Sequence, residues 1–195
     1  MKPNKIVIAS HNDKKIAEIK NMLTLFNIEV LSATELDLPD VEETGKTFAE
    51  NAILKAKTLA NLCGLPCLGD DSGLCVDALD GRPGVYSARY APNRDFNQGM
   101  DMLIHELENS GTNNWSAHFS CVLAFALPNS ECTLFEGRVD GKIVAQKSGT
   151  NGLGYDPIFC PDGYDKTFAC FSQEEKAAIS HRGRAFKKFI SWLQS

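Results

Sequence analysis

The chain has 195 residues, 43% of them hydrophobic and 23% charged, which is the composition of one soluble globular domain and argues against a disordered or fibrous protein. Twenty lysines and arginines stand against twenty-five aspartates and glutamates, so the net charge of −5 has the wrong sign for a protein that binds mainly through a nucleic-acid backbone. A few basic side chains in one cleft can still hold a small anion, because the local field and the net charge are separate quantities.

The N-terminal region predicts neither an export signal nor a membrane anchor. The apolar run at 5–9 is followed at once by the polar sequence HNDKK, so it is too short for a signal-peptide core or a spanning segment. The seven cysteines include no CxxC pair, and several occupy apolar, strand-like contexts typical of reduced thiols. These features predict a cytoplasmic protein.

The first part of the chain predicts a strand, a polar loop and a helix. Residues 5–9 form a β-branched apolar run, and residues 10–13 are polar. Apolar residues then recur at helical spacing, at Ile16, Ile19, Leu23 and Phe26. Residues 28–31 predict the next strand, after which the chain becomes acidic and unsuited to a core.

An Ala- and Leu-rich segment at 47–62 predicts a second helix. Thr47, with Glu50 three residues later, is the sequence of a capping box. Lys55 and Lys57 lie two positions apart on this helix and therefore cannot face the same way. We expect one of these lysines to point toward a cleft and the other to meet water.

The second half predicts a helix at 100–107, a central strand at 117–127 that is apolar on both faces, and a last helix from about Gly183. Asp140 and Gly141 predict a hairpin turn between two strands. No internal repeat and no Ser/Pro-rich linker interrupts the chain. These elements together predict one α/β domain.

The loop Ser10–Lys15, with the sequence SHNDKK, is the first candidate site. It joins a strand to a helix, so its backbone N–H groups lie at the positive end of that helix, where they can bind an anion. The alternative is that Ser10 or Asn12 only caps the helix and the lysines are solvated. The loop alone does not decide between the two.

Acidic residues form the second candidate site. Asp70 and Asp71 stand between glycines, and adjacent residues of an extended backbone point to opposite sides, so the two carboxylates should have different roles. Mg²⁺ takes one or two protein carboxylates together with water and phosphate oxygens. Glu42 and Glu43 precede the second helix. The alternatives are an Asp-rich turn for the aspartates and a favourable helix-dipole interaction for the glutamates.

A glycine-rich loop and a basic cluster complete the candidates. Residues 149–157, GTNGLGYDP, match neither a P-loop nor a dinucleotide fingerprint, but their glycines would let the backbone approach a ligand while Tyr155 packs on a planar group. Lys176, His181 and Arg182 suit a phosphate or a base carbonyl. A tight loop and a capped helix start with solvated charges are the alternatives.

Six blocks of sequence, in this order and at these distances, resemble the Ham1-like inosine triphosphate pyrophosphatase family. The blocks are S-x-N-x-x-K at 10–15, EETG-x-TF-x-ENA at 42–52, DDSGL at 70–74, PGVYSARY at 83–90, GYDPIF at 154–159 and SHR at 180–182. The resemblance spans nearly the whole chain, from Ile6 to the last helix. Each block alone is weak, whereas the six together are specific.

The resemblance implies a single Ham1-like domain over residues 1–195, with an elongated, bilobal α/β fold. A central mixed sheet flanked by helices and an active-site cleft between the lobes are expected. The family hydrolyses the non-standard purine nucleoside triphosphates ITP, dITP and XTP to the monophosphate and pyrophosphate with Mg²⁺, as a cytoplasmic homodimer. The resemblance thus implies a nucleotide substrate, and neither polymeric nucleic acid nor a membrane as partner.

The resemblance also assigns roles to matching positions. The triphosphate would be held by the first loop: Ser10, His11, Asn12, Asp13, Lys14 and Lys15. Glu43 and Asp71 would hold the metal, and Asp71 would also orient or deprotonate the attacking water. The other substrate contacts would fall on Ser72, Leu153, Gly154, Tyr155, Asp156, Lys176, His181 and Arg182. The family often has Gly at position 11 and Phe at position 153, so Tyr155 is the expected planar contact here.

Base selection has a physical explanation in these assignments. Hypoxanthine and xanthine present a carbonyl at position 6 where adenine presents an amino group, so donors from Arg182 and loop N–H groups would disfavour adenine. Two other functions stay open: a nucleotide sensor without hydrolysis, and a phosphohydrolase that releases orthophosphate. The presence of both Glu43 and Asp71 speaks against the sensor, and product identity separates the two hydrolases.

Overall fold

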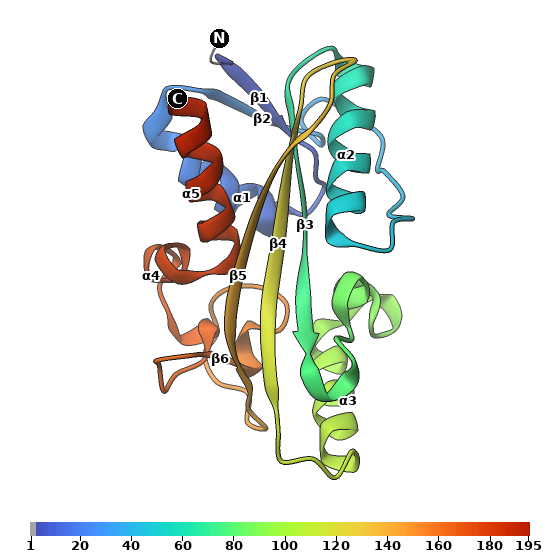
Figure 1. Ribbon diagram of the computed structural model, residues 1–195, viewed down its shortest axis with the longest axis vertical. Coiled ribbons are helices and arrows are strands. Elements are labelled where there is room, and N and C mark those ends of the chain that lie inside the picture. Colours follow the sequence, from blue (N-terminus) through green and yellow to red (C-terminus); the bar gives the residue numbers. More distant parts are fainter. Residues whose placement is uncertain (1–2) are drawn as a thin grey trace. The chain divides into compact units, whose positions relative to one another are not determined.

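The computed structural model describes residues 3–195 and contains one mixed β-sheet flanked by helices (Figure 1). Within these residues six strands lie in the order β2-β1-β3-β4-β5-β6. Their bounds are β1 Lys5–Ile8, β2 Glu29–Ser32, β3 Cys67–Val76, β4 Ser116–Ala126, β5 Thr133–Ile143 and β6 Phe159–Pro161. Strand β1 pairs in parallel with β2 and β3, whereas β5 and β6 are antiparallel. The predicted α/β class with a mixed sheet is confirmed.

Five α-helices occur in the described part of the chain. They are α1 Asp13–Leu23, α2 Phe48–Cys63, α3 Phe96–Asn109, α4 Gln173–Ile179 and α5 His181–Gln194. Short 3₁₀ turns lie at Thr24–Phe26, Asp77–Leu79, Gly84–Arg89, Pro92–Arg94, Asp156–Ile158 and Phe168–Cys170. The helices predicted at 47–62 and 100–107 and the central strand at 117–127 are confirmed, whereas the seven-residue helix α4 was not expected. None of these helices is long and apolar enough to cross a membrane.

The chain folds into two compact units, which we describe separately. The first unit comprises the chain up to Asp71, Cys121–Glu136 and Ala185–Ser195, and the second comprises Ser72–Ser120 and Gly137–Arg184. Strands β3, β4 and β5 each contribute residues to both units. The expected cleft between lobes stays a prediction.

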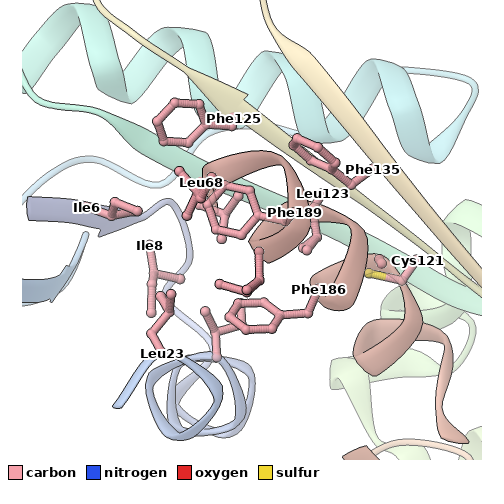
Figure 2. Close-up of a cluster of buried hydrophobic side chains, with 14 of the residues drawn as sticks. Ile6, Ile8, Leu23, Leu68, Cys121, Leu123, Phe125, Phe135, Phe186 and Phe189 are labelled. Atoms are coloured by element: carbon pink, nitrogen blue, oxygen red, sulfur yellow. The ribbon is translucent and has the colours of Figure 1, made fainter. Parts of the chain in front are cut away.

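Two apolar layers cover the two faces of the sheet in the first unit. Helices α1 and α5 lie on one side of its strands and α2 lies on the other (Figure 1). Figure 2 shows Phe186 and Phe189 of α5 packed toward Ile6, Ile8 and Leu68 of β1 and β3. The neighbouring strand residues Val7 and Cys67 instead pack in the same cluster as the alanines of α2. Consecutive side chains of β1 and β3 therefore alternate between two buried layers.

Helix α2 is fixed at its start and along its length. The predicted capping box is present, because the Glu50 N–H donates to Thr47 Oγ1 (3.1 Å) and the Thr47 N–H donates to Glu50 Oε2 (3.2 Å). A Cβ at Gly69 of β3 would lie 2.3 Å from the Ala52 carbonyl oxygen of α2. The glycine therefore permits helix and strand to approach closely, just before the two aspartates of β3.

The second unit has its own aromatic core. Phe119 of β4 contacts Phe159 and Phe168 at centroid distances of 4.8 and 6.1 Å. Helix α3 adds Met100, Leu103 and Leu107 to the same cluster. These rings support the segments on either side of α4.

The predicted hairpin turn at Asp140 and Gly141 is wrong, because β5 runs unbroken through both residues. Gly141 pairs with Pro161 of β6, and a Cβ on it would lie 2.3 Å from the Cys160 carbonyl oxygen. The glycine therefore serves a close approach between strands rather than a turn.

Candidate active site

The two adjacent aspartates of β3 point to opposite faces of the sheet, as their alternation predicts. The Asp70 carboxylate accepts from Lys15 Nζ (2.7 Å) and from the Cys121 thiol (3.3 Å), on the face covered by α1 and α5. The Asp71 carboxylate accepts from Asn51 Nδ2 (2.9 Å), on the face covered by α2. Both aspartates are almost fully buried, at 1% and 4% exposure. Each is therefore held by partners of its own.

The loop Ser10–Lys15 is organised as a helix cap. Asn12 Oδ1 accepts from the backbone N–H groups of Lys14 and Lys15, each at 3.1 Å, and Ser10 Oγ accepts from the Asn12 N–H at 3.1 Å. The capping interpretation is thus correct, but the lysines are not both solvated. Lys14 and Asp13 are exposed, whereas the Lys15 ammonium pairs with the buried Asp70.

His11 turns away from its own loop. Its Nε2 lies 2.9 Å from the Leu38 carbonyl oxygen, and its Nδ1 lies 3.5 Å from Asp40 Oδ1. The His11 side chain therefore attaches this loop to the acidic segment that follows β2.

On the side of the sheet that α2 covers, the candidate site contains the buried cation Lys55, which contacts several acidic and carbonyl oxygens. Its Nζ donates to Glu43 Oε1 (2.7 Å) and to the Asp70 carbonyl oxygen (2.6 Å), and it lies 3.8 Å from Asp71 Oδ1. Lys57 points elsewhere, with its Nζ 3.6 Å from the exposed Glu131 carboxylate. The expectation that the two lysines face different ways is confirmed, and Lys55 is the buried one.

Burial raises the pKa of the Asp71 carboxyl above its ordinary value. The positive charges of Lys55 and Lys15 oppose this shift, the Glu43 carboxylate adds to it, and the hydrogen bond from Asn51 lowers the pKa. The net result is a carboxylate that binds a proton more readily than an exposed aspartate. Such a group suits a general base.

The same acids fit a divalent cation. Glu43 and Asp71 come from separate segments and converge on one positive centre, Lys55 Nζ, which shows that both carboxylates can face a single charge. Within residues 3–195 no group of three or more His, Cys, Asp or Glu side chains could hold a metal ion. A site with two protein carboxylates matches Mg²⁺, which takes its remaining ligands from water and substrate phosphate.

In the second unit, Asp156 joins the glycine-rich loop to helix α4. Its Oδ2 accepts from the Leu153 N–H (2.8 Å) and from Lys176 Nζ (2.6 Å). Ser172 and Glu175 form a capping box that starts α4 and so places Lys176. Both charged groups of this pair are buried. The loop is therefore held in one conformation by a buried ion pair.

The expected stacking by Tyr155 is corrected. Its ring is 2% exposed, its hydroxyl donates to the Ser87 carbonyl oxygen (3.0 Å), and it packs edge-on against Phe96. The ring is thus part of the core of the second unit and offers no face to a planar ligand. Leu153 and Gly154 are only partly buried, so the loop backbone keeps its candidate role.

The basic cluster at the start of α5 is buried rather than solvated. Arg182 is 1% exposed and donates from Nη2 to Ser72 Oγ (2.9 Å). The His181 ring stacks on Phe119 with a centroid distance of 4.8 Å and an interplanar angle of 12°. Ser180 Oγ accepts from the Gly183 N–H (3.1 Å), so the cap expected there is present. Only the solvated-charge alternative is wrong.

The structure thus assembles two groups of the predicted residues. In the first unit these are the loop Ser10–Lys15, Glu43 and Asp71, and in the second they are Ser72, Leu153–Asp156, Lys176, His181 and Arg182. Their meeting in one pocket stays a prediction.

Sequence reasoning did not single out Asn51, and it placed Asp70 in a candidate site without assigning it a specific role. The signal for Asn51 was a polar residue in the buried stripe of α2, whose other members are alanines, Leu59 and Lys55.

Comparisons with known proteins identify relatives over nearly the full length of the chain. The model of the Ham1 family matches residues 6–192. A dITP/XTP pyrophosphatase of Agrobacterium fabrum is 46% identical, covering 95% of this chain and 94% of its own, and one of Caulobacter vibrioides is 47% identical, covering 97% of both. Among solved structures, a HAM1 protein from Coxiella burnetii superposes with a TM-score of 0.90 at 40% identity, covering 97% of this chain and 98% of its own.

Proposed function

Because the chain belongs to the Ham1 family, we propose that it hydrolyses non-standard purine nucleoside triphosphates, namely dITP, XTP and ITP, to the monophosphate and pyrophosphate. Relatives that are 43–47% identical over 95–98% of this chain carry the name dITP/XTP pyrophosphatase. The geometric observation that carries the proposal is the convergence of Glu43 and Asp71 on the Lys55 ammonium. A site that gathers carboxylates and cations suits phosphoryl chemistry.

We propose that Lys15 is a phosphate-binding cation. A nucleoside triphosphate carries about four negative charges near neutral pH, and cations with fixed positions stabilise both the bound substrate and the departing pyrophosphate. Asp70 fixes the Lys15 ammonium at 2.7 Å beside the capped start of α1. The N–H groups at this helix start add a positive potential of their own.

Asp71 is the proposed general base. Its raised pKa and its hydrogen bond from Asn51 favour a carboxylate that orients a water molecule and accepts its proton. The water oxygen forms a bond to the α-phosphorus, the bond from the α-phosphorus to the bridging oxygen breaks, and pyrophosphate departs with the electron pair. Glu43 and Asp71 would hold Mg²⁺, which neutralises charge on the phosphate oxygens when bound.

Residues of the second unit are proposed to select the base. Arg182 is fixed by Ser72, and the glycine-rich loop is fixed by the Asp156–Lys176 pair. Donors from the guanidinium and from the loop backbone match the 6-carbonyl of hypoxanthine and xanthine, whereas the 6-amino group of adenine would meet donors. Because burying unpaired donors is costly, this mismatch disfavours ATP.

We also propose that the protein works as a cytoplasmic homodimer and acts on free nucleotides rather than on nucleic acid or membranes. The net charge of −5 supports small-molecule substrates over polymeric nucleic acid. The seven cysteines are all thiols, as expected in a reducing compartment. Sedimentation at micromolar concentration tests the dimer, and a single monomeric species would contradict it.

Product identification tests the proposed function. The protein is incubated with dITP, XTP, GTP or ATP and Mg²⁺, and the phosphorus-containing products are resolved by ³¹P NMR. We expect pyrophosphate and monophosphate from dITP and XTP, with much slower turnover of GTP and ATP. Release of orthophosphate would identify a phosphohydrolase instead. Tight binding of dITP without any release would identify a nucleotide sensor.

A further inference from the structure

Asn51 is a fully buried amide whose two ends contact two parts of the candidate active site. Its Nδ2 donates to Asp71 Oδ2 (2.9 Å), and its Oδ1 accepts from the Gly45 N–H (2.8 Å). Its exposure is 0%. The neighbours determine which end of the amide is which, because the Gly45 N–H can only donate and the carboxylate accepts.

The fold of α2 does not account for this residue. The helix is already capped by Thr47 and Glu50, and apart from Lys55, which also faces the candidate site, the other buried positions of its stripe, such as Ala52 and Ala56, are apolar. Burying an amide costs free energy unless it is hydrogen-bonded, and the bonds that offset this cost here go outside the helix, to Gly45 and to Asp71. The contacts of Asn51 therefore relate to the carboxylate that it touches.

Asn51 and Lys55 lie one turn apart on α2 and make two parallel connections between the same two segments. Asn51 joins the backbone at Gly45 to Asp71 Oδ2. Lys55 joins Glu43 Oε1 at 2.7 Å to Asp71 Oδ1 at 3.8 Å. Each oxygen of the Asp71 carboxylate is contacted by a different group, and two such contacts fix the plane of the carboxylate. A contact at one oxygen alone would let the carboxylate rotate.

We propose that Asn51 is a positioning residue for the hydrolysis: it fixes the plane of the Asp71 carboxylate and its distance from the segment that carries Glu43. This role rests on the proposed function, since Asp71 is the base of that reaction. The amide does not touch the reacting atoms. Its loss should therefore lower kcat while it leaves KM nearly unchanged.

The test is Asn51→Asp, which keeps the acceptor for the Gly45 N–H but places an oxygen where Nδ2 donates to Asp71. We expect kcat for dITP to fall by about 10- to 100-fold, as for other residues that support a reacting group, with KM changed by less than about threefold. Asn61→Asp is the matched control. It lies on the same helix, and Asn61 Oδ1 also accepts a backbone N–H bond, from Asn129 at 2.8 Å. The control should leave both constants unchanged.

A second readout separates the contact from the catalytic consequence. Asn51→Asp should lower the urea midpoint of unfolding, and adding Asp71→Asn should restore at least half of that loss, because an amide at position 71 can donate to a carboxylate at position 51. This double variant should recover no activity. If Asn51→Asp does not fold, Asn51→Ser replaces it, since a hydroxyl on a shorter side chain cannot reach both partners.

A folded Asn51→Asp or Asn51→Ser protein with kcat within twofold of the wild type would overturn the proposal. A rise in KM for dITP with kcat unchanged would overturn it as well. Failure of the proposed function gives a different result, because the wild type then releases no pyrophosphate from dITP. In that case the positioning role fails with it, while the urea midpoints still report whether residues 51 and 71 are in contact.

Discussion

Asp70 and Asp71 are neighbours in β3, yet the Asp70 carboxylate pairs with Lys15 of α1 while the Asp71 carboxylate accepts a hydrogen bond from Asn51 of α2. One strand therefore carries two charge networks, one on each face, although the charge of Lys15 also acts on the Asp71 carboxyl. Because the two carboxylates have different hydrogen-bond partners in Lys15 and Asn51, substitutions of these partners should give separable effects on substrate binding and on the chemical step.

Replacement of Lys15 by methionine should weaken both stability and substrate binding. Asp70, with a side chain of 0% exposure, would lose the ammonium at 2.7 Å, and removing one partner of a buried ion pair costs about 3 to 5 kcal/mol. Chemical denaturation measures this loss. KM for dITP should rise as well, because a phosphate-binding cation is removed.

A second substitution distinguishes these two effects of Lys15. Adding Asp70→Asn to Lys15→Met removes the buried negative charge of Asp70, so most of the lost stability should return while KM for dITP stays high. Lys14→Met is the control, since that side chain is exposed and should change stability by less than about 0.5 kcal/mol. Recovery of substrate affinity in the double variant would show that Lys15 is only structural.

Lys55→Met should destabilise the protein far more than Lys57→Met on the same helix. The Lys55 ammonium is buried among Glu43, Asp71 and the Asp70 carbonyl oxygen, so its removal takes a positive charge away from two carboxylates. Because Glu43 remains partly exposed, we expect a loss of about 1 to 3 kcal/mol in urea unfolding. The exposed pair of Lys57 with Glu131 should be worth less than about 0.5 kcal/mol. Equal losses in the two variants would contradict this assignment.

Asp71→Asn should abolish turnover without unfolding the protein. Asparagine has the same shape and can still accept the hydrogen bond from Asn51 Nδ2, so the thermal midpoint should stay within about 3 °C of the wild type. Loss of the general base alone lowers kcat by about 10²- to 10⁴-fold. A folded variant that retains near-wild-type turnover would remove Asp71 from the mechanism.

Cys170 should be the cysteine that reacts first with iodoacetamide at neutral pH. Hydrogen-bond contacts of its Sγ with Ser148 Oγ (3.3 Å) and Thr167 Oγ1 (3.5 Å) lower the pKa of its thiol, and the side chain is only partly buried. Burial raises the pKa of Cys75 and Cys132 instead. Because the thiolate is the nucleophile, alkylation mapped by mass spectrometry should appear at Cys170 before these two. Earlier modification of Cys75 or Cys132 would be inconsistent with this environment.

Local sequence patterns predicted the elements whose cause is local. The capping box of Thr47 with Glu50, the spacing of apolar residues in α3 and the two-sided apolar strand β4 all follow from neighbouring residues, and all are present. The opposite directions of Asp70 and Asp71 follow in the same way from the alternation of an extended backbone. The Asp-Gly turn failed because the role of Gly141 depends on β6, about twenty residues further along the chain.

The candidate site was predictable in its residues but not in its pairings. Lys15 and Asp70 are 55 positions apart, and Arg182 and Ser72 are 110 apart, so no local pattern reveals these contacts. Tyr155 carried an ambiguous signal, since an aromatic ring beside glycines suits both a ligand contact and a core. The packing against Phe96 resolved it.

The attack of water on the α-phosphorus, with Asp71 as base, is tested most directly by hydrolysing dITP in ¹⁸O-labelled water and locating the isotope by mass spectrometry. We predict one labelled oxygen in the deoxyinosine monophosphate and none in the pyrophosphate, at a rate that Asp71→Asn reduces at least a hundredfold. Label in the pyrophosphate would place the attack on the β-phosphorus and contradict the proposed reaction.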